Sequence, residues 1–177
     1  MKTPQTAGHL VTFYDADEHL VATAGEYLRE GLDAGCTCIV VATPAHRAGI
    51  AGQLANSGLN PAALESRYQY IPLDAQAMLT NFMVEGQLDR RRFHETVGLL
   101  MRQAAARGQP VRIYGEMVAM LAAENSLEAS LELEELWNEL SRQQTFLLLC
   151  GYPNAVFNSD AKRAERRHIC AVHSRVC

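Results

Sequence analysis

The sequence contains very little lysine, and neither of its two lysines is well placed for chemistry. They are Lys2, near the amino terminus, and Lys162, in a charged segment near the carboxyl terminus. A phosphate-binding P-loop needs a lysine that follows a glycine-rich loop. A Schiff-base enzyme needs a lysine whose pKa is lowered in its pocket. The sequence therefore offers no lysine for either chemistry.

The common catalytic motifs are also missing. The sequence has no G-x-S-x-G nucleophile elbow, no H-E-x-x-H zinc motif and no G-x-G-x-x-G turn after the first apolar run. Cys150 has no evident base beside it, and a buried thiol without a base is normally inert. We therefore expect no catalytic residue and no enzyme activity.

Long apolar runs are missing as well. The first six residues lack the apolar segment of a secretion signal. No run approaches the roughly 20 apolar residues that cross a bilayer. The 20 acidic and 16 basic residues give a net charge of −4, so electrostatics do not favour nucleic acid or an anionic membrane. We expect a cytoplasmic protein that binds neither directly.

Cysteine is present, but its spacing does not favour a metal site. Five cysteines in a reducing cytoplasm are expected to be thiols rather than disulfides. Cys36 and Cys38 are one residue apart, whereas structural zinc sites usually place two to four residues between paired cysteines. A second group near the carboxyl terminus contains His168, Cys170, His173 and Cys177. The sequence predicts no metal and no other cofactor.

Apolar runs alternate with amphipathic segments, which is typical of a parallel sheet with crossover helices. Strands are expected at 9–14, 36–43, 68–73, 111–118 and 146–152, with a short sixth at 169–172. Helices are expected after Asp15, at 45–56, at 74–84, after Asp89 and at 126–142. The pattern predicts one three-layer αβα domain, residues 1–177, with a mainly parallel sheet of five or six strands.

The helix expected at 126–142 carries two polar residues on its apolar side. At 100° per residue, its acidic residues mostly fall on one solvent-facing arc. Glu134 and Asn138 instead fall among the leucines and Trp137, four residues apart. A carboxylate on a packed face is costly unless it is paired. Glu134 is therefore either a structural hydrogen-bond partner or part of a site.

Ligands of an open parallel sheet bind beyond the carboxyl ends of its strands. The expected strand ends present the following side chains: Tyr14, Asp15, Thr43, His46, Asp74, Glu116, Cys150 and Tyr152. Glu116 follows a glycine, which permits close approach of a ligand or another segment. We expect Tyr14, Tyr152 and Met117 to form pocket walls, with Glu116 and Cys150 as polar contacts. A buried Glu116 held only by backbone amides or an arginine is the structural alternative.

His9 begins its expected strand, and this position separates it from Tyr14. At a rise of roughly 3.3 Å per residue, the two residues lie about 16 Å apart. One small ligand cannot easily contact both side chains. His9 therefore has either a structural role or a role at a different place from Tyr14.

Seven segments of the chain resemble a known family in the same order. They are 9–14 (HLVTFY), 41–47 (VATPAHR), 82–86 (FMVEG), 111–118 (VRIYGEMV), 133–140 (LEELWNEL), 148–153 (LLCGYP) and 169–174 (ICAVHS). Together they are similar to the MEDS family, named for the sensory domain of methanogens, methylotrophs and the dichloromethane-dehalogenase regulator. The resemblance covers nearly the whole chain.

The resemblance implies a RecA/KaiC-like core without a P-loop. It also implies an input domain of prokaryotic signalling that detects simple hydrocarbon derivatives and acts through a histidine kinase or a DNA-binding regulator. With the strand-end argument, it gives these candidate ligand-binding residues: His9, Tyr14, Glu116, Met117, Glu134, Asn138, Cys150, Tyr152 and His173. A degenerate nucleotide-binding module and a ligand-free dimerisation scaffold remain alternatives, and homodimerisation stays open.

Overall fold

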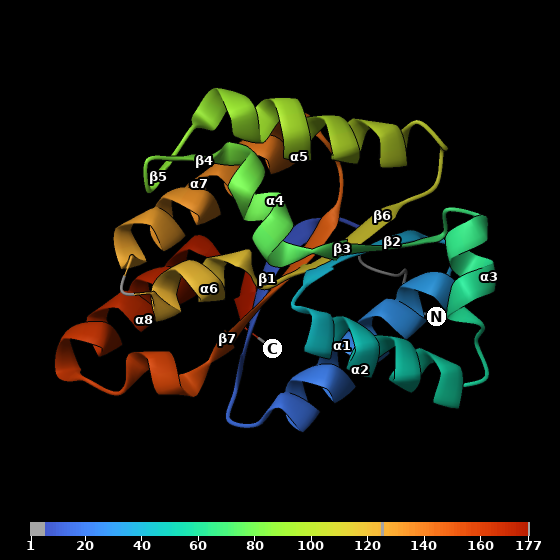
Figure 1. Cartoon of the computed structure of the whole chain (residues 1–177), viewed down its shortest axis with the longest axis horizontal. Helices are drawn as coiled ribbons and strands as arrows, with labels where there is room; N and C mark the ends of the chain where they lie inside the picture. Colours follow the sequence, from blue (N-terminus) through green and yellow to red (C-terminus); the bar gives the residue numbers. More distant parts are fainter. Residues whose placement is uncertain (1–5, 125, 177) are drawn as a thin grey trace.

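A computed structural model describes residues 6–124 and 126–176, and it has three layers (Figure 1). A parallel sheet of six strands lies in the middle, in the order β3-β2-β6-β7-β1-β8. Helices lie on both faces of this sheet, so the expected αβα architecture is confirmed. The strands of this sheet are β1 (Gly8–Tyr14), β2 (Thr37–Ala42), β3 (Tyr70–Asp74), β6 (Val111–Gly115), β7 (Leu147–Pro153) and β8 (Arg175–Val176).

Helices cover both faces of the sheet. One face packs against α1 (Asp17–Asp33) and α2 (Pro44–Asn56), with α3 (Pro61–Ser66) at its edge. The other face carries a larger set of helices (Figure 1). They are α4 (Ala75–Phe82), α5 (Arg90–Ala105), α6 (Met117–Ala123), α7 (Leu127–Gln143) and α8 (Asp160–Val172), with the short 3-10 helix η1 (Asn154–Phe157) before α8.

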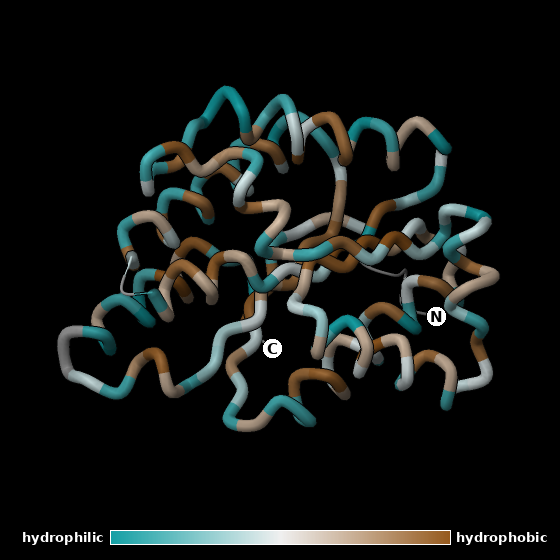
Figure 2. The backbone as a smooth tube through the Cα atoms, in the orientation of Figure 1, coloured by the Kyte–Doolittle hydropathy of each residue, from teal (hydrophilic) through white to brown (hydrophobic). Residues whose placement is uncertain are grey.

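The strands are buried because both of their faces are apolar. All six residues of β2 are buried, as expected for a strand with helices on both sides. Successive side chains alternate between the two cores: Ile39 and Val41 pack beneath α4 and α5, whereas Val40 packs beneath α1 and α2. Figure 2 shows this apolar centre as largely brown strands between helices whose colour alternates between teal and brown.

Several helix ends follow the expected local chemistry. The side chains of Asp74 and Asp89 accept hydrogen bonds from backbone amides at the starts of α4 and α5, which satisfies amides that have no partner inside the helix. Pro44 is the first residue of α2, and Thr43 is its cap. The first helix begins at Asp17, with Asp17 and Glu18 in its first turn.

The structure corrects three of the predicted elements. The strand predicted at 111–118 ends at Gly115, and α6 begins two residues later. The strand predicted at 169–172 is wrong, because these residues complete α8 and the edge strand is β8. A short apolar run does not distinguish a strand from a buried helical turn. The helix predicted to reach Val84 ends at Phe82.

A small hairpin follows that helix. It consists of β4 (Met83–Val84) and β5 (Gln87–Leu88), which pair antiparallel. Glu85 and Gly86 form its two-residue turn with positive φ values of 51° and 80°, as a type I′ turn requires.

In the described part of the chain, no helix combines the length and hydrophobicity needed to span a bilayer. Cys36, Cys38, Cys150 and Cys170 are free thiols. Lys2 and Cys177, which entered the sequence argument, lie outside the described residues.

Candidate functional site

The nine predicted ligand residues do not form one group in the structure. Six of them gather between β1, β7, α7 and the end of α8: His9, Glu134, Asn138, Cys150, Tyr152 and His173. Tyr14 and Glu116 lie at the carboxyl ends of β1 and β6, near His46. Met117 is a buried core residue at the start of α6.

Strand pairing and helix periodicity build the larger group, which we call the buried cluster. In the β1–β7 register, His9 pairs with Leu148 and Val11 with Cys150. Every second side chain points to the same face, so His9, Cys150 and Tyr152 all project towards α7. On α7, Glu134 and Asn138 are four residues apart, so both side chains point from this helix towards the sheet. The expectation that Glu134 lies on the packed side of this helix is confirmed, because its exposure is 0%.

Four potential metal-ligand atoms of the buried cluster lie within 4.8 Å of one another. Nε2 of His9 is 3.1 Å from a carboxylate oxygen of Glu134 and 3.3 Å from the sulfur of Cys150. Nε2 of His173 is 3.4 Å from the other oxygen of Glu134. All four residues are buried, and the two imidazole rings are 4.0 Å apart between centroids.

Neighbouring acceptors fix the proton position on each histidine. The side-chain nitrogen of Asn138 donates to the carbonyl of Val172, so its oxygen is the atom 2.9 Å from Nδ1 of His9 and accepts from it. Nδ1 of His173 donates to the carbonyl of Ile169 over 2.6 Å. In the neutral form, each ring therefore presents the lone pair of Nε2 to Glu134.

Glu134 is also held from its other side. The hydroxyl of Tyr152 donates to Oε1 of Glu134 over 2.7 Å. Burial alone would raise the pKa of Glu134, but hydrogen bonds and positive charge from His173 and His9, which these rings supply only when Nε2 also carries a proton, lower it to about 2. Burial and the charge of Glu134 raise the pKa values of Cys150 and Tyr152 well above their usual ranges. Glu134 is thus the ionised centre of the cluster, with a neutral thiol and phenol beside it.

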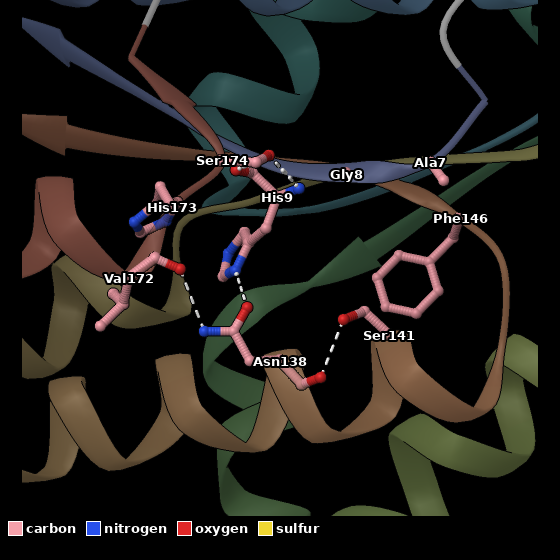
Figure 3. A pocket seen from close by; sticks show the side chains of 9 residues that line it. All are labelled: Ala7, Gly8, His9, Asn138, Ser141, Phe146, Val172, His173 and Ser174. Carbon is pink, nitrogen blue, oxygen red and sulfur yellow. Dashed lines mark hydrogen bonds between the residues drawn. The ribbon is translucent and has the colours of Figure 1, made fainter.

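A cavity of about 360 Å³ opens beside the buried cluster. Figure 3 shows His9 and His173 on one side of it, Asn138 and Ser141 on α7, and the ring of Phe146 beside Ser141. Gly8, Val172 and Ser174 complete its lining. The cavity lies at the amino end of β1, the opposite edge of the parallel sheet from the one that the sequence argument predicted for a ligand.

The second group, which we call the edge pair, consists of Glu116 and His46. One oxygen of Glu116 accepts from the backbone amide of Thr43. The other accepts from Nδ1 of His46 over 2.7 Å and from the hydroxyl of Tyr114 over 3.1 Å. Burial raises the pKa of Tyr14, and the charges of Glu116 and Asp17 raise it further. The hydrogen bond to Glu116 raises the pKa of His46 from its ordinary value of 6.5.

The two tyrosines that were predicted to form the walls of one pocket lie on opposite faces of the sheet. Tyr14 packs against the core beneath α1 and α2, whereas Tyr152 belongs to the core on the other side. The two side chains therefore do not line one cavity. Near the edge pair, a separate cavity of about 400 Å³ between α1 and α2 is lined by Asp17, Ala22, Ala45, His46 and their neighbours.

Several contributors to these sites were missed in the sequence. Ser141, Phe146 and Ser174 line the cavity beside His9, and Ser130 lies 3.1 Å from the hydroxyl of Tyr152. Tyr114 had a visible signal, because it stands two residues before Glu116 in the segment 111–118 that the sequence predicted to be a strand. The serines had no such signal in the sequence, because isolated serines occur throughout the chain.

Comparison with known proteins identifies the family. No curated protein matches the chain significantly. The family model described as MEDS, the methanogen/methylotroph, DcmR sensory domain, matches residues 8–174. The match begins at the first residue of β1 and ends beside His173, so it includes both polar groups described above. The chain therefore belongs to the MEDS family of sensory domains, which is associated with signal transduction.

Proposed function

We propose that this domain senses a small organic molecule that binds in the cavity beside His9. The observation that carries the proposal is that a cavity of about 360 Å³ reaches His9 and His173 of a buried polar cluster. This volume is within the range of small-molecule pockets, which combine apolar walls with a few polar groups. The domain would bind its ligand and signal without converting it chemically.

The lining favours a short carbon chain with one polar group. Phe146 and Val172 supply apolar contact, while Asn138 and Ser141 supply polar atoms. This composition agrees with simple hydrocarbon derivatives as the ligand class. It does not favour a nucleotide, since the described lining contains no lysine or arginine that would bind phosphate.

Occupancy of the cavity would be transmitted through the end of α8. Ser174 lines the cavity, and its amide and its hydroxyl both donate to the carbonyl of His9 over 2.7 Å. Its hydroxyl also accepts from the amide of His9 over 2.9 Å. A ligand that binds better to one position of this segment would shift the population of that position. A histidine kinase or a DNA-binding regulator would read this shift.

The proposal is tested by blocking the cavity. Short alcohols, amines, halides and carboxylates would be added as a mixture, and binding would be detected by saturation-transfer NMR. We expect Ser141→Phe to abolish the binding seen with the unchanged chain, because the new ring fills the cavity from α7. Ala22→Phe, an exposed site lining the cavity between α1 and α2, is the matched control and should retain binding. Binding that survives Ser141→Phe and is lost in Ala22→Phe would contradict the proposal and assign the ligand to the edge pair.

A further inference from the structure

We propose that His9, Glu134, Cys150 and His173 form a binding site for one divalent transition-metal ion, with zinc as the best fit. The inference goes beyond the proposed function, because a metal can bind whether or not the cavity takes an organic ligand. Two imidazoles, one carboxylate and one thiol are the donor types that zinc uses in proteins. In the described residues these four groups come from four separate parts of the fold and are all buried.

The spacing of the donor atoms suits a tetrahedral ion. With bonds of about 2.0–2.3 Å to nitrogen, oxygen and sulfur, neighbouring ligands of tetrahedral zinc lie about 3.3–3.8 Å apart. One oxygen of Glu134 is 3.1 Å from His9 and 3.8 Å from Cys150, its other oxygen is 3.4 Å from His173, and His9 is 3.3 Å from Cys150. One donor atom from each residue gives a set with no pair beyond 4.8 Å. Small side-chain adjustments are enough to place all four donors around one ion.

Each histidine also has the outer partner that metal-binding histidines usually have. Such a histidine donates its second ring nitrogen to a carbonyl or carboxylate, which fixes the ring and the tautomer. Here Asn138 accepts from Nδ1 of His9, and the carbonyl of Ile169 accepts from Nδ1 of His173. Tyr152 donates to Glu134 in the same way. The outer contacts leave Nε2 of both rings free to bind metal.

Without a cation, the inner atoms of the cluster are poorly matched. Nε2 of His173 is buried and has no hydrogen-bond partner, although it lies 3.4 Å from Glu134. Nε2 of His9 presents a lone pair to a carboxylate oxygen at 3.1 Å. A buried polar atom without a partner is costly. A proton on one ring would still leave Nε2 of the other without a partner, and protons on both would place two cationic rings 4.0 Å apart between centroids beside one carboxylate. One metal ion binds both nitrogens at once.

The charges of the four donors balance a divalent ion. Glu134 supplies one negative charge, both histidines are neutral, and Cys150 supplies a second negative charge as a thiolate. Metal binding would release the thiol proton of Cys150 to solvent with no change in oxidation state, as a coordinating thiol is deprotonated. The loaded site would be neutral overall, which a buried position requires.

A bound ion would connect distant parts of the sheet and helices. Its donors belong to β1, α7, β7 and the residue after α8. The ion would therefore fix the end of α8 to the core, beside the cavity that His9 and His173 share.

The test uses cobalt(II) as a spectroscopic probe of the chelator-treated chain. One equivalent of cobalt should produce the strong visible bands of a tetrahedral ion and a near-ultraviolet thiolate-to-cobalt band. Cys150→Ser should remove the near-ultraviolet band, and Cys170→Ser should leave both bands unchanged. Circular dichroism would establish that each variant folds.

Asn138→Leu gives a second test that leaves all four donors in place. Asn138 is a positioning residue for His9, so this variant should weaken cobalt affinity about 10- to 100-fold while the shape of the spectrum is retained. A folded wild-type chain that binds no cobalt would overturn the inference. So would a near-ultraviolet band that survives in Cys150→Ser or disappears in Cys170→Ser. Ligand binding in the cavity is measured separately, so the two proposals can fail independently.

Discussion

The buried cluster and the edge pair both combine glutamate with histidine, but their hydrogen bonding differs. Each oxygen of Glu116 accepts from at least one donor, and the outer nitrogen of His46 lies near the exposed Asp17. Both oxygens of Glu134 also accept, from Tyr152 and from Cys150, but Nε2 of His9 and of His173 face this carboxylate as well, and Nε2 of His173 has no hydrogen-bond partner.

This difference separates a structural role from a binding role. A glutamate–histidine pair in which every carboxylate oxygen and ring nitrogen has a partner from its own chain is a complete hydrogen-bonded unit. A buried cluster in which a ring nitrogen faces the acid without a hydrogen bond is incomplete until another group enters. Its position at a strand end made Glu116 a prominent candidate in the sequence. Whether the hydrogen bonds of the acid and its histidines are complete is therefore a better indicator of a binding role than position at a strand end.

The largest expected effect is on stability in Glu134→Ala. Removing this carboxylate takes away the acceptor of the Tyr152 hydroxyl and the Cys150 thiol, and also the buried negative charge that balances a proton or a metal ion on the two imidazoles. We expect the free energy of unfolding to fall by about 3–5 kcal/mol, measured by urea denaturation. Glu135→Ala, at the exposed next position of α7, should change it by less than about 0.5 kcal/mol. Similar losses in the two variants would contradict the central position of Glu134.

Glu116→Gln should have a smaller effect. The variant keeps the shape of the side chain but removes the charge and replaces one acceptor with a donor. Because hydrogen bonds to charged groups are the stronger ones, we expect a loss of about 2–3 kcal/mol in the same denaturation experiment. Ligand binding and cobalt binding should be unchanged. If either is lost in a folded Glu116→Gln chain, the edge pair takes part in binding after all.

Two tyrosine variants compare a satisfied hydroxyl with an unsatisfied one. Tyr152→Phe removes the hydrogen bond to Glu134 and should cost about 1–2 kcal/mol. The hydroxyl of Tyr70 is buried and has no hydrogen-bond partner, so Tyr70→Phe should be neutral or slightly stabilising. A greater loss in Tyr70→Phe than in Tyr152→Phe would show that the two hydroxyls have been assigned the wrong roles.

The smallest expected effect is the pH dependence that His46 contributes. Its pKa is raised in the folded state by the hydrogen bond to Glu116. The contribution is therefore complete below the unfolded value near 6.5 and is lost as the pH rises through the folded value. We expect less than about 1 kcal/mol, because solvent screens the outer nitrogen and the exposed Asp17 beside it. Urea denaturation between pH 6 and 9 should show this decline in the unchanged chain and a flatter curve in His46→Gln; equal curves would contradict it.

The fold could be predicted from the sequence more fully than the site. Apolar runs such as 36–43 gave five strands of the main sheet and most of the helices, because burial on both faces leaves a continuous apolar signal. The periodicity of α7 also placed Glu134 on the packed side. The end of α8 and the two-residue strand β8 were too short for periodicity to resolve.

The arrangement of the site depends on contacts between distant residues, which no local pattern records. His9, Glu134, Cys150 and His173 were each candidates, yet 125 residues separate the first from the second. Their convergence depends on the β1–β7 pairing and on the path of α8. For the same reason, metal-ligand spacing along the sequence gave no indication of a metal site.

The most direct test of the account is nitrogen-15 NMR of the histidine rings, before and after one equivalent of zinc. Single His→Gln variants would assign the signals of the six histidines. We predict that His9 and His173 carry their proton on Nδ1, and that zinc shifts the Nε2 signals of these two rings while leaving those of His46 unchanged. A zinc-induced shift at His46 without one at His9 and His173, or no shift in any ring, would contradict it.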